Sequence, residues 1–480
     1  MSVSSASETA SPGTAVKPGL VLALTSGATF LAFLDTTVVN VAFPALRDSF
    51  SSASVSTLSW VVSAYAVLFA ALLTPAGRLA DVLGRKRLFL LGLLLFTVAS
   101  LLSAISPNIE MLNIFRGLQG ATAAAMIPSA LGLVLFETPA EHRTAAIGVW
   151  GATASLAAVA GPTLGGVLVD VFSWRAIFLI NLPLGLFLAF AGFRNLPKDR
   201  PTGHRLPDII GTVAVTLGIG LVVAGLTEGY GWGWTNVKTI GALAVGLVLV
   251  LFGLFRSRTH PAPAVEISLW RNRTFAQANL TSLLSGIAMF GWLLSGPLFV
   301  STVWHYSVIK SGVSVVPGAI TGAVAAIIVG KRLSLAGQRA SVSIGMILFG
   351  ANGIWMYYAV GADPSFWSVW FPAGSIGGIG LGMTMTGLSS VAAVSVPQTR
   401  FATGIGLNLT ARQLGGALGV AAVAVILSEK GLRGPQGFDD IFLFSGIAAG
   451  VAALAGLMLL RSRPATAPAG AATAAAGSEG

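Results

Sequence analysis

Two charged side chains near the start of the chain interrupt long apolar stretches. Asp35 follows Leu34 in one stretch, and Arg116 follows Phe115 in another. A carboxylate in the interior of a membrane is costly and marks a functional site by default. At about 1.5 Å per residue, Asp35 lies roughly 13 Å and Arg116 roughly 10 Å from the same side of the membrane. We therefore expect the two to pair as a proton-coupling site. The alternative is a purely structural pair that holds helices together.

Further polar residues are expected to line a substrate cavity together with Asp35. They are Thr36, Asn40, Asn113, Asn408 and Arg412. Thr36 and Asn40 are one helical turn apart, so the alternative for them is a hydrogen bond that packs neighbouring helices. Arg412 lies about 18 Å in from the start of its own stretch, near the midplane. It can pair with Asp35, bind an anionic group, or face a water-filled cavity.

A short charged segment, Gly77–Arg87, separates two long apolar runs and cannot itself cross a bilayer, so the runs are expected to be neighbouring spans. Its basic residues are Arg78, Arg85, Lys86 and Arg87. Basic residues close to span ends mark the cytoplasmic side. Gly77 and Gly84 allow a tight turn. Asp81 is placed to meet an arginine or the positive end of a neighbouring helix. The alternative is an ordinary basic loop.

Small residues and one proline recur along the apolar stretch Thr144–Val169. They are Gly148, Gly161, Pro162, Gly165 and Gly166. Proline removes a backbone donor and bends a helix, while glycine lets two helices cross closely. Taken alone, this pattern is typical of helix packing in any membrane protein.

The composition places most of the chain in a membrane. The chain has 480 residues, of which 54% are hydrophobic and 9% charged, and it has no cysteine. Disulfides, iron–sulfur clusters and thiol catalysis are therefore excluded. The formal net charge of +11 does not indicate nucleic-acid binding, because no basic groove with interleaved aromatic residues is visible. The histidines are scattered over different loops without metal-ligand spacing, so we expect neither an enzyme nor a bound cofactor or metal.

We count fourteen apolar segments of spanning length. They are Gly19–Ala45, Ser56–Ala76, Leu88–Ile105, Met111–Phe136, Thr144–Val169, Ala176–Phe193, Ile209–Leu226, Ile240–Phe255, Phe275–Val303, Val313–Val329, Ala340–Val360, Trp367–Val394, Gly404–Leu427 and Ile441–Leu460. This count predicts an all-α polytopic membrane protein of six, two and six spans.

The expected organisation has a tail at each end. It comprises a disordered tail over 1–18, a six-helix bundle over 19–194, two extra spans over 207–256, a second six-helix bundle over 272–461 and a disordered tail over 462–480. Alternating the loops with the N-terminus inside places most basic residues in the cytoplasm, where anionic lipids are their natural partners. Both tails are then cytoplasmic, and Asp35 is the only acid within a predicted span.

A weak internal repeat supports two related halves. Gly330, Lys331 and Gly337 repeat the spacing of Gly77, Arg78 and Gly84, and Ser334 stands where Asp81 does. Transporters with a binding site near the midplane commonly consist of two such halves.

These motifs together resemble the fourteen-span drug:proton antiporter family of the major facilitator superfamily. The matching stretches are Leu34–Pro44, Gly77–Arg87, Arg116–Gly120, Gly148–Gly166, Trp174–Pro183 and Arg412–Gly416. The resemblance implies the major facilitator fold, with Gly77–Arg87 acting as a conformational latch. It also implies that the Gly148–Gly166 pattern is the one associated with antiporters. Ala157 departs from that pattern, because glycine is usual there. Some family members carry acids in the second-half spans, where this sequence has none.

The sequence therefore predicts a proton-coupled secondary transporter that exports small amphipathic compounds, drugs or antibiotics among them. The alternative is a dedicated exporter of an endogenous metabolite, neutral or anionic, and a proton-coupled importer is less favoured. We expect the cell membrane as its location and a monomer as its state. The expected partners are the substrate, protons and membrane lipids.

Overall fold

The computed structural model describes residues 17–199, 206–430 and 436–461. Within these ranges the chain is helical, and no strand occurs. The first helices are α1 (Pro18–Val41), α2 (Phe43–Ser49), α3 (Val55–Leu83), α4 (Arg85–Ala104), α5 (Ile109–Glu137), η1 (Ala140–His142), α6 (Arg143–Val171), α7 (Ala176–Leu179) and α8 (Asn181–Asn195). The predicted first span is broken at Ala42, because Pro44 favours the first turn of a new helix.

The central helices are α9 (Ile209–Trp232) and α10 (Val237–Thr259), followed by the short η2 (Ile267–Arg271). The remaining helices are α11 (Arg273–Thr302), α12 (Val308–Ser314), α13 (Val316–Arg332), α14 (Leu335–Ala359), η3 (Phe366–Trp370), α15 (Phe371–Val394), η4 (Gln398–Arg400), α16 (Phe401–Lys430) and α17 (Gln436–Arg461). Each predicted span thus corresponds to a helix, with ends that differ by a few residues. The predicted tails lie almost entirely outside the described residues.

Thirteen helices in the described part of the chain are long and apolar enough to cross a membrane. The predicted fifth span, Thr144–Val169, corresponds to the 29-residue helix α6, which is not one of the thirteen. The fourteen-span arrangement accordingly stays a prediction.

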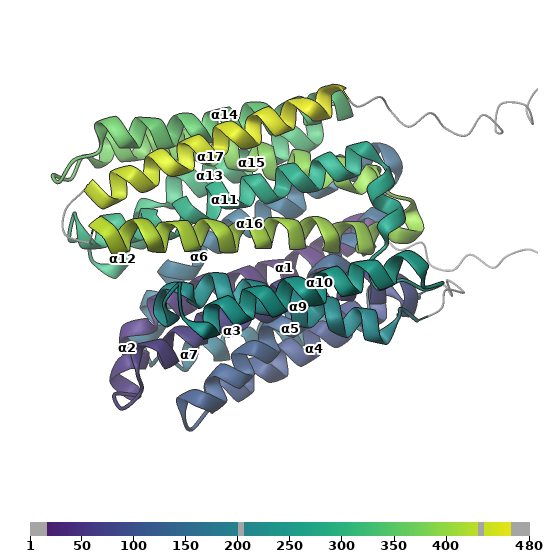
Figure 1. The fold of residues 1–480 in the computed structure, drawn as a ribbon, viewed down its shortest axis with the longest axis horizontal. Helices are drawn as coiled ribbons and strands as arrows, with labels where there is room; N and C mark the ends of the chain where they lie inside the picture. The colour runs from purple at the N-terminus through teal and green to yellow at the C-terminus, as the bar shows by residue number, and fades with distance from the viewer. Residues whose placement is uncertain (1–16, 200–205, 431–435, 462–480) are drawn as a thin grey trace, which may run out of the picture.

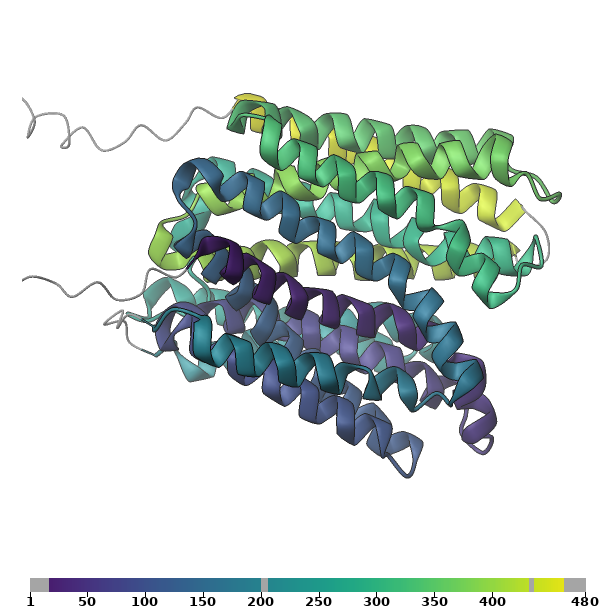
Figure 2. The same cartoon turned by 180° about the vertical axis from the view of Figure 1, so that it is seen from behind.

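The helices form two layers that lie side by side (Figures 1 and 2). One layer contains α1 and α3–α5, and the other contains α11 and α13–α17. Helices α6 and α16 connect the layers, because α6 packs on both α1 and α13, and α16 packs on both α3 and α5. The central helix α9 contacts α3 of one layer and α16 of the other. A movement of one layer against the other must therefore involve α6, α9 and α16.

The start of α1 and the end of α17 lie at the same end of the molecule (Figures 1 and 2). We call this end the Asp81 side, because α3 ends and α4 begins there. The opposite end is the Trp232 side, where α9 ends and α10 begins.

The segment Gly77–Arg87 is almost entirely helical, which corrects the expectation of a loop. Helix α3 continues to Leu83, and Gly84 alone separates it from α4. Gly84 has φ of 112°, a conformation that a residue with a Cβ rarely adopts, so its predicted role in a turn is confirmed. Gly77 does not turn the chain. It lies within α3 and lets the backbone of α16 approach at Ala402, where a Cβ on Gly77 would collide with the carbonyl oxygen.

The helix α9 extends six residues beyond the predicted end at Leu226, and the extension brings Glu228 into the helix as a buried residue. The expectation that Asp35 is the only acid within a span is therefore wrong. At the other end of α9, Asp208 pairs with Arg256 of α10. The hydrogen bond from Arg256 holds the pKa of Asp208 below its usual value.

The α9–α10 pair gives a direct test of its topology. Thr235 and Thr259 are exposed residues at opposite ends of α10. Single substitutions Thr235→Cys and Thr259→Cys are expected to react with a membrane-impermeant thiol reagent from opposite sides of the membrane. The wild-type chain has no cysteine and is the blank. Labelling of both variants from one side would show that α10 does not cross.

Candidate functional site

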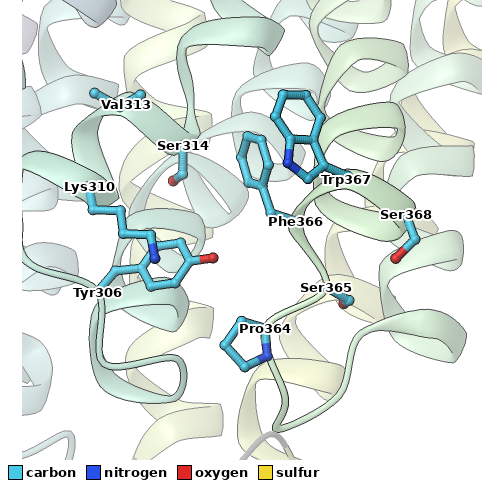
Figure 3. Close-up of a pocket in the computed structure, with 9 residues that line it drawn as sticks. All are labelled: Tyr306, Lys310, Val313, Ser314, Pro364, Ser365, Phe366, Trp367 and Ser368. Atoms are coloured by element: carbon cyan, nitrogen blue, oxygen red, sulfur yellow. The ribbon is translucent and has the colours of Figure 1, made fainter.

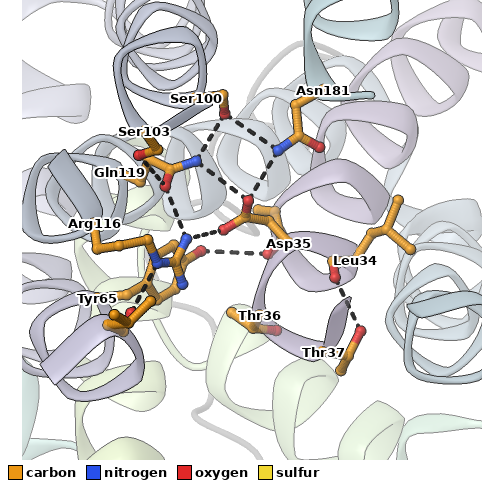
Figure 4. A network of polar contacts seen from close by, with 12 residues as sticks. Leu34, Asp35, Thr36, Thr37, Tyr65, Ser100, Ser103, Arg116, Gln119 and Asn181 are labelled. Atoms are coloured by element: carbon orange, nitrogen blue, oxygen red, sulfur yellow. Dashed lines mark hydrogen bonds and ion pairs between the residues drawn. The ribbon is translucent and has the colours of Figure 1, made fainter. Parts of the chain in front are cut away.

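Asp35 of α1 lies at the centre of a polar network in the first layer of helices (Figure 4). Its Oδ2 forms an ion pair with Nη1 of Arg116, which confirms the predicted pairing, and the two side chains are 0% and 1% exposed. Its Oδ1 accepts hydrogen bonds from Gln119 Nε2 at 3.2 Å and Asn181 Nδ2 at 2.9 Å. The carboxylate thus has a charge partner and two neutral donors, as a stable buried charge requires.

The guanidinium of Arg116 is held from several directions. Its Nε donates to the carbonyl oxygen of Val61 at 2.9 Å, and its Nη1 donates to Gln119 Oε1 at 2.8 Å. Aromatic rings cover it, because its Cζ lies 4.6 Å from the ring centroid of Tyr65 and 5.7 Å from that of Phe178. These contacts fix the arginine beside α3 and α7 as well as beside Asp35.

Gln119 connects the pair to α4. It is three residues after Arg116, so the two side chains share a face of α5. Its Nε2 donates to Ser100 Oγ at 2.7 Å, and its Oε1 accepts from Ser103 Oγ at 3.2 Å. Ser100 Oγ also accepts from Asn181, the first residue of α8, at 3.2 Å. Helices α1, α4, α5 and α8 therefore meet at one hydrogen-bonded cluster around Asp35.

The sequence did not single out Gln119, Asn181, Ser100 or Tyr65 as site residues. Gln119 and Asn181 lie within stretches that carry the family resemblance, and Gln119 also has the helical spacing to Arg116. For Ser100 and Tyr65 no sequence signal exists, because serine and tyrosine in apolar helices are common and only the crossing of α3, α4 and α5 brings them together.

The small residues of α6 pack directly on α1 beside Asp35. A side chain at Gly161 would collide with Thr37, and one at Gly165 would lie 2.8 Å from a methyl group of Val38. Thr37 Oγ1 also donates to the carbonyl oxygen of Ala157 at 3.3 Å. Ala157 is the residue at which the sequence departs from the family pattern. The pattern therefore brings α6 into contact with the turn of α1 that follows Asp35. The side chain of Pro162 lies outside the described residues, and Gly166 is buried.

Nearer the start of α6, Gly148 contacts the second layer. A Cβ on Gly148 would lie 2.5 Å from the carbonyl oxygen of Ala326 and 3.1 Å from Cα of Gly330, both in α13. Gly330 belongs to the second copy of the weak repeat. Ser334 of the same copy caps α14 by accepting a hydrogen bond from Gly337 N at 3.3 Å.

The expected cavity residues do not converge on Asp35. Thr36 Oγ1 donates to Phe33 O at 2.7 Å within its own helix, and the side chain of Asn40 lies outside the described residues. Asn113 Nδ2 donates to Thr57 O at 2.9 Å. Asn408 Nδ2 donates to Ser282 Oγ at 2.8 Å, between α16 and α11. The Asn113 and Asn408 bonds join neighbouring helices, whereas the Thr36 bond stays within α1, so the helix-packing alternative for Thr36 and Asn40 stays a prediction.

Arg412 does not pair with Asp35, so that option is wrong for this structure. Its Nη1 lies 3.0 Å from the sulfur atom of Met385 in α15. Among the described residues, no carboxylate oxygen lies within 4.0 Å of its guanidinium. Binding of an anionic group and exposure to a water-filled cavity remain open as its role.

A cavity of about 530 Å³ lies at the Trp232 side of the second layer (Figure 3). Tyr306, Lys310 and Trp367 line it, and Lys310 Nζ lies 3.8 Å from the ring centroid of Tyr306. Its lining shares no residue with the Asp35 cluster, so it does not give a substrate direct access to that cluster.

Asp81 links the two layers at the Asp81 side of the membrane, which is opposite the side of this cavity. It forms an ion pair with Arg85 at 2.7 Å. It also accepts hydrogen bonds from Thr403 N at 2.7 Å and Thr403 Oγ1 at 2.8 Å. Thr403 lies in the first turn of α16, where free N–H groups and the helix dipole favour a negative charge. The sequence predicted either an arginine or a helix N-terminus as partner, and Asp81 has both.

Neighbouring residues strengthen this contact. Arg85 Nη2 donates to Gln398 O at 2.6 Å. Arg78 pairs at 3.3 Å with Glu266, a buried residue between α10 and α11, which also pairs at 3.0 Å with Arg400 of η4. Glu266 was not predicted as a site residue, because an acid in a loop has no distinctive spacing. It connects both layers through the segment that follows the central helices.

Lys86 binds the segment that follows α8 rather than a helix of the second layer. Its Nζ donates to Leu196 O at 2.6 Å, and its backbone N donates to Asp199 Oδ1 at 2.9 Å. Asp199 thereby caps α4, a second contact that sequence reasoning did not find. Lys86 therefore supports the start of α4 rather than the contact between layers.

Comparison with known proteins identifies the family. The sequence model of the Major Facilitator Superfamily matches residues 25–420. The chain belongs to this superfamily. The described fold agrees, because the structure of the human organic anion transporter MFSD10 (TETRAN) superposes with a TM-score of 0.64 over 92% of this chain and 99% of that one, at 14% identity.

Several bacterial relatives are similar over most of their length. Multidrug resistance protein Stp of Mycobacterium tuberculosis is 30% identical, over 85% of this chain and 76% of its own. The probable actinorhodin transporter of Streptomyces coelicolor is 32% identical over 85% and 72%. The puromycin resistance protein of Streptomyces alboniger is 32% identical over 92% and 89%. The protein is thus a multi-pass membrane protein related to multidrug and antibiotic exporters.

The buried pair predicts a large effect on stability. Arg116→Gln leaves the carboxylate of Asp35 uncompensated, so we expect the free energy of unfolding to fall by about 3–5 kcal/mol. Asp35→Asn in the same chain removes the orphaned charge and is expected to recover most of this loss. The measurement is denaturant unfolding in detergent micelles, with the exposed Arg47→Gln as the matched control. A loss below about 1 kcal/mol for Arg116→Gln would contradict the prediction.

Proposed function

We propose that this protein is a proton-coupled antiporter, a transporter rather than an enzyme, that exports small amphipathic compounds. The named relatives support export, because they include multidrug resistance proteins, a tetracenomycin C resistance and export protein and a methylenomycin A resistance protein. The proposal includes fourteen spans in the cell membrane, both termini in the cytoplasm, a monomeric state and no cofactor. The proton gradient supplies the energy.

The observation that carries the proposal is the buried ion pair of Asp35 and Arg116. A proton and a guanidinium compete for the same carboxylate. When Asp35 takes up a proton, its attraction to Arg116 falls, and the arginine retains Val61 and Gln119 as partners. Protonation therefore weakens the contact between α1 and α5 without leaving the arginine unbound. This is the property that a proton-driven conformational switch requires.

The packing of α6 carries such a change to the second layer. Helix α1 touches α6 at Gly161 and Gly165, and α6 touches α13 at Gly148. Because these contacts are close and lack flexible side chains, a shift of α1 displaces α6 and with it α13. In this way protonation in one layer biases the position of the other, and the two layers rock about their interface.

The Asp81 contacts hold the present state. Asp81 and Arg85 join the first layer to the start of α16, and Arg78 joins it to Glu266. We propose that these residues, with the turn at Gly84 and the close crossing at Gly77, act as the latch that keeps the Asp81 side closed. The basic residues of Gly77–Arg87 support a cytoplasmic position for this side.

A dedicated exporter of an endogenous metabolite, neutral or anionic, is the second candidate. Arg412 favours it, because its partner is the Met385 sulfur and the described residues place no carboxylate beside it. An anionic substrate group is the natural ligand of such a guanidinium. A growth-inhibition panel containing puromycin, tetracenomycin C and methylenomycin A, with and without the gene, separates the candidates. Protection against several unrelated compounds supports multidrug export, and protection against none favours the metabolite.

The coupling mechanism predicts the behaviour of Asp35→Asn. Asparagine imitates the protonated carboxyl permanently, so uphill export driven by a pH gradient and proton release on substrate addition are both expected to be lost. Downhill exchange of a neutral substrate survives. The measurement is transport in proteoliposomes, with the exposed Asp170→Asn as the matched control. Uphill export by Asp35→Asn at the wild-type rate would show that the proton travels elsewhere.

The latch predicts a different defect for Asp81→Asn. This change weakens the charge-assisted bonds to Arg85 and the first turn of α16 but touches no substrate. We expect transport to slow several-fold, while equilibrium binding of the same compound to the purified protein stays within about twofold. The exposed Glu110→Gln is the control. Parallel loss of binding and transport would indicate a folding defect or a direct substrate contact instead.

A further inference from the structure

Glu228 is a buried carboxyl group that the coupling mechanism described above does not use. It lies on α9, four residues before the end of the helix at Trp232, which is about 6 Å along the axis. The residue is 5% exposed. Trp232 stacks on Trp60 of α3, with ring centroids 6.3 Å apart. Tryptophan is typical of the membrane–water interface, so Glu228 lies roughly one helical turn inside the apolar region.

The partners of Glu228 are neutral. Its side chain forms a hydrogen bond with Ser63 of α3. Within the described ranges, no lysine, arginine or histidine nitrogen lies within 4.0 Å of its carboxyl group. Charged residues with described side chains on the helices that pack against α9 are Arg78 and Asp81 of α3, Lys238, Arg256 and Arg258 of α10, and Arg412 of α16. The side chains of Glu429 and Lys430, at the end of α16, lie outside the described residues.

None of these charges forms an ion pair with the carboxyl group. Arg78, Asp81, Arg256 and Arg258 lie at the Asp81 side of the membrane, opposite Glu228. Lys238 is exposed at the start of α10. Arg412 binds the sulfur of Met385.

This environment differs from that of Asp35 in one decisive respect. An ionised carboxylate in an apolar interior costs several kcal/mol unless a cation compensates it. Asp35 has Arg116 as its cation, whereas Glu228 has only a hydroxyl group. An apolar surrounding without a cation favours the neutral, protonated form of a carboxyl group. The surroundings of Glu228 in this state of the protein therefore favour the proton-bound form.

The position of Glu228 connects it to both layers and to the Asp35 pair. Ser63 is two residues after Val61, whose carbonyl oxygen binds Arg116. The two positions differ by about 3 Å along the axis of α3 and by about 200° around it. Arg116 and Glu228 thus contact opposite faces of one helix. Because α9 also packs on α16, a movement between the layers changes the surroundings of Glu228.

We propose that Glu228 is a second proton-binding site of the transporter, loaded from the Trp232 side and emptied when the layers move. The inference rests on the proposed proton-coupled function and extends it to two protons per cycle. One proton binds Oδ of Asp35 and displaces the guanidinium. The other binds Oε of Glu228 and remains hydrogen-bonded to Ser63. No further reactant is needed, because both steps only bind and release a proton.

Linkage between protonation and conformation provides the test. The equilibrium constant between two conformations changes tenfold per pH unit for each proton that the change takes up or releases. Cysteines introduced by Ser51→Cys and Ala362→Cys, both at exposed positions on the Trp232 side, carry spin labels on the two layers. The full chain in lipid nanodiscs is then measured by pulsed electron resonance from about pH 5 to about pH 10.

Protonation at the two sites acts in opposite directions on the equilibrium between the layers. A proton on Asp35 favours the moved state, whereas a proton on Glu228 favours the present state, so the two responses partly cancel in the wild-type background. In Glu228→Gln only Asp35 responds, and we expect about a tenfold change per pH unit towards the moved state as the pH falls. Glutamine keeps the shape and the hydrogen bond to Ser63, so a merely structural role of Glu228 predicts the wild-type response. Asp35→Asn leaves only Glu228 and is expected to give about a tenfold change per pH unit in the opposite direction.

Two controls keep the outcome decisive. Glu228→Asp keeps a carboxyl group and is expected to keep the wild-type response. Ser63→Ala keeps Glu228 and is expected to move the midpoint only. A pH-dependent Glu228→Gln response identical to that of the wild type overturns the second site and leaves the proposed function intact. A Glu228→Gln variant whose distances do not depend on pH contradicts proton coupling at Asp35 itself.

Discussion

The structure depends on the high cost of an isolated charge in an apolar interior. Asp35 and Arg116 are both buried within the first layer of helices, and neither is stable there alone. Their pairing requires α1 and α5 to lie side by side at one depth. The remaining lone pairs and N–H groups require further partners, which α3, α4 and α8 provide through Val61, Ser100 and Asn181. One electrostatic constraint thus organises five helices.

Close contacts between helix backbones connect the Asp35 cluster to the second layer. The lipid supplies no hydrophobic force between helices, so small residues at the crossings decide how closely they approach. Gly161 and Gly165 bring α6 onto α1, and Gly148 brings it onto α13. The Asp35 cluster in the first layer is therefore connected, through a single helix, to the second layer. The hydrogen bonds of Asp81 join the two layers again at the Asp81 side.

The two buried carboxyl groups show how environment assigns different roles to similar side chains. Asp35 faces a guanidinium and is stabilised as an anion, so a proton must compete with an arginine for it. Glu228 has no cation beside it in the described part of the chain, and such a surrounding favours the neutral acid. Helix α3 separates the two groups and contacts the partners of both. Arg412 is the converse case, a cation beside a thioether sulfur and, within the described residues, without a carboxylate partner.

Much of the architecture follows from the sequence by itself. Apolar segments of spanning length predicted where helices occur, because a chain in lipid must satisfy its backbone hydrogen bonds within each segment. The cost of buried charge predicted that Asp35 and Arg116 pair, and the small residues of α6 predicted close crossings. Glycine at position 84 predicted the turn, since its φ of 112° suits no other residue well.

Only the tertiary structure decided the rest, because it depends on which helices cross and at what depth. Sequence periodicity cannot show that Ser100, Tyr65 and Asn181 meet at Asp35, or that Arg412 lies beside Met385 instead. A count of apolar residues also does not predict where a helix ends. Continued backbone hydrogen bonding carries α3 through Gly77 and carries α9 past Leu226, where packing against Ser63 buries Glu228. A carboxyl group that composition assigns to a loop thereby becomes part of the membrane interior.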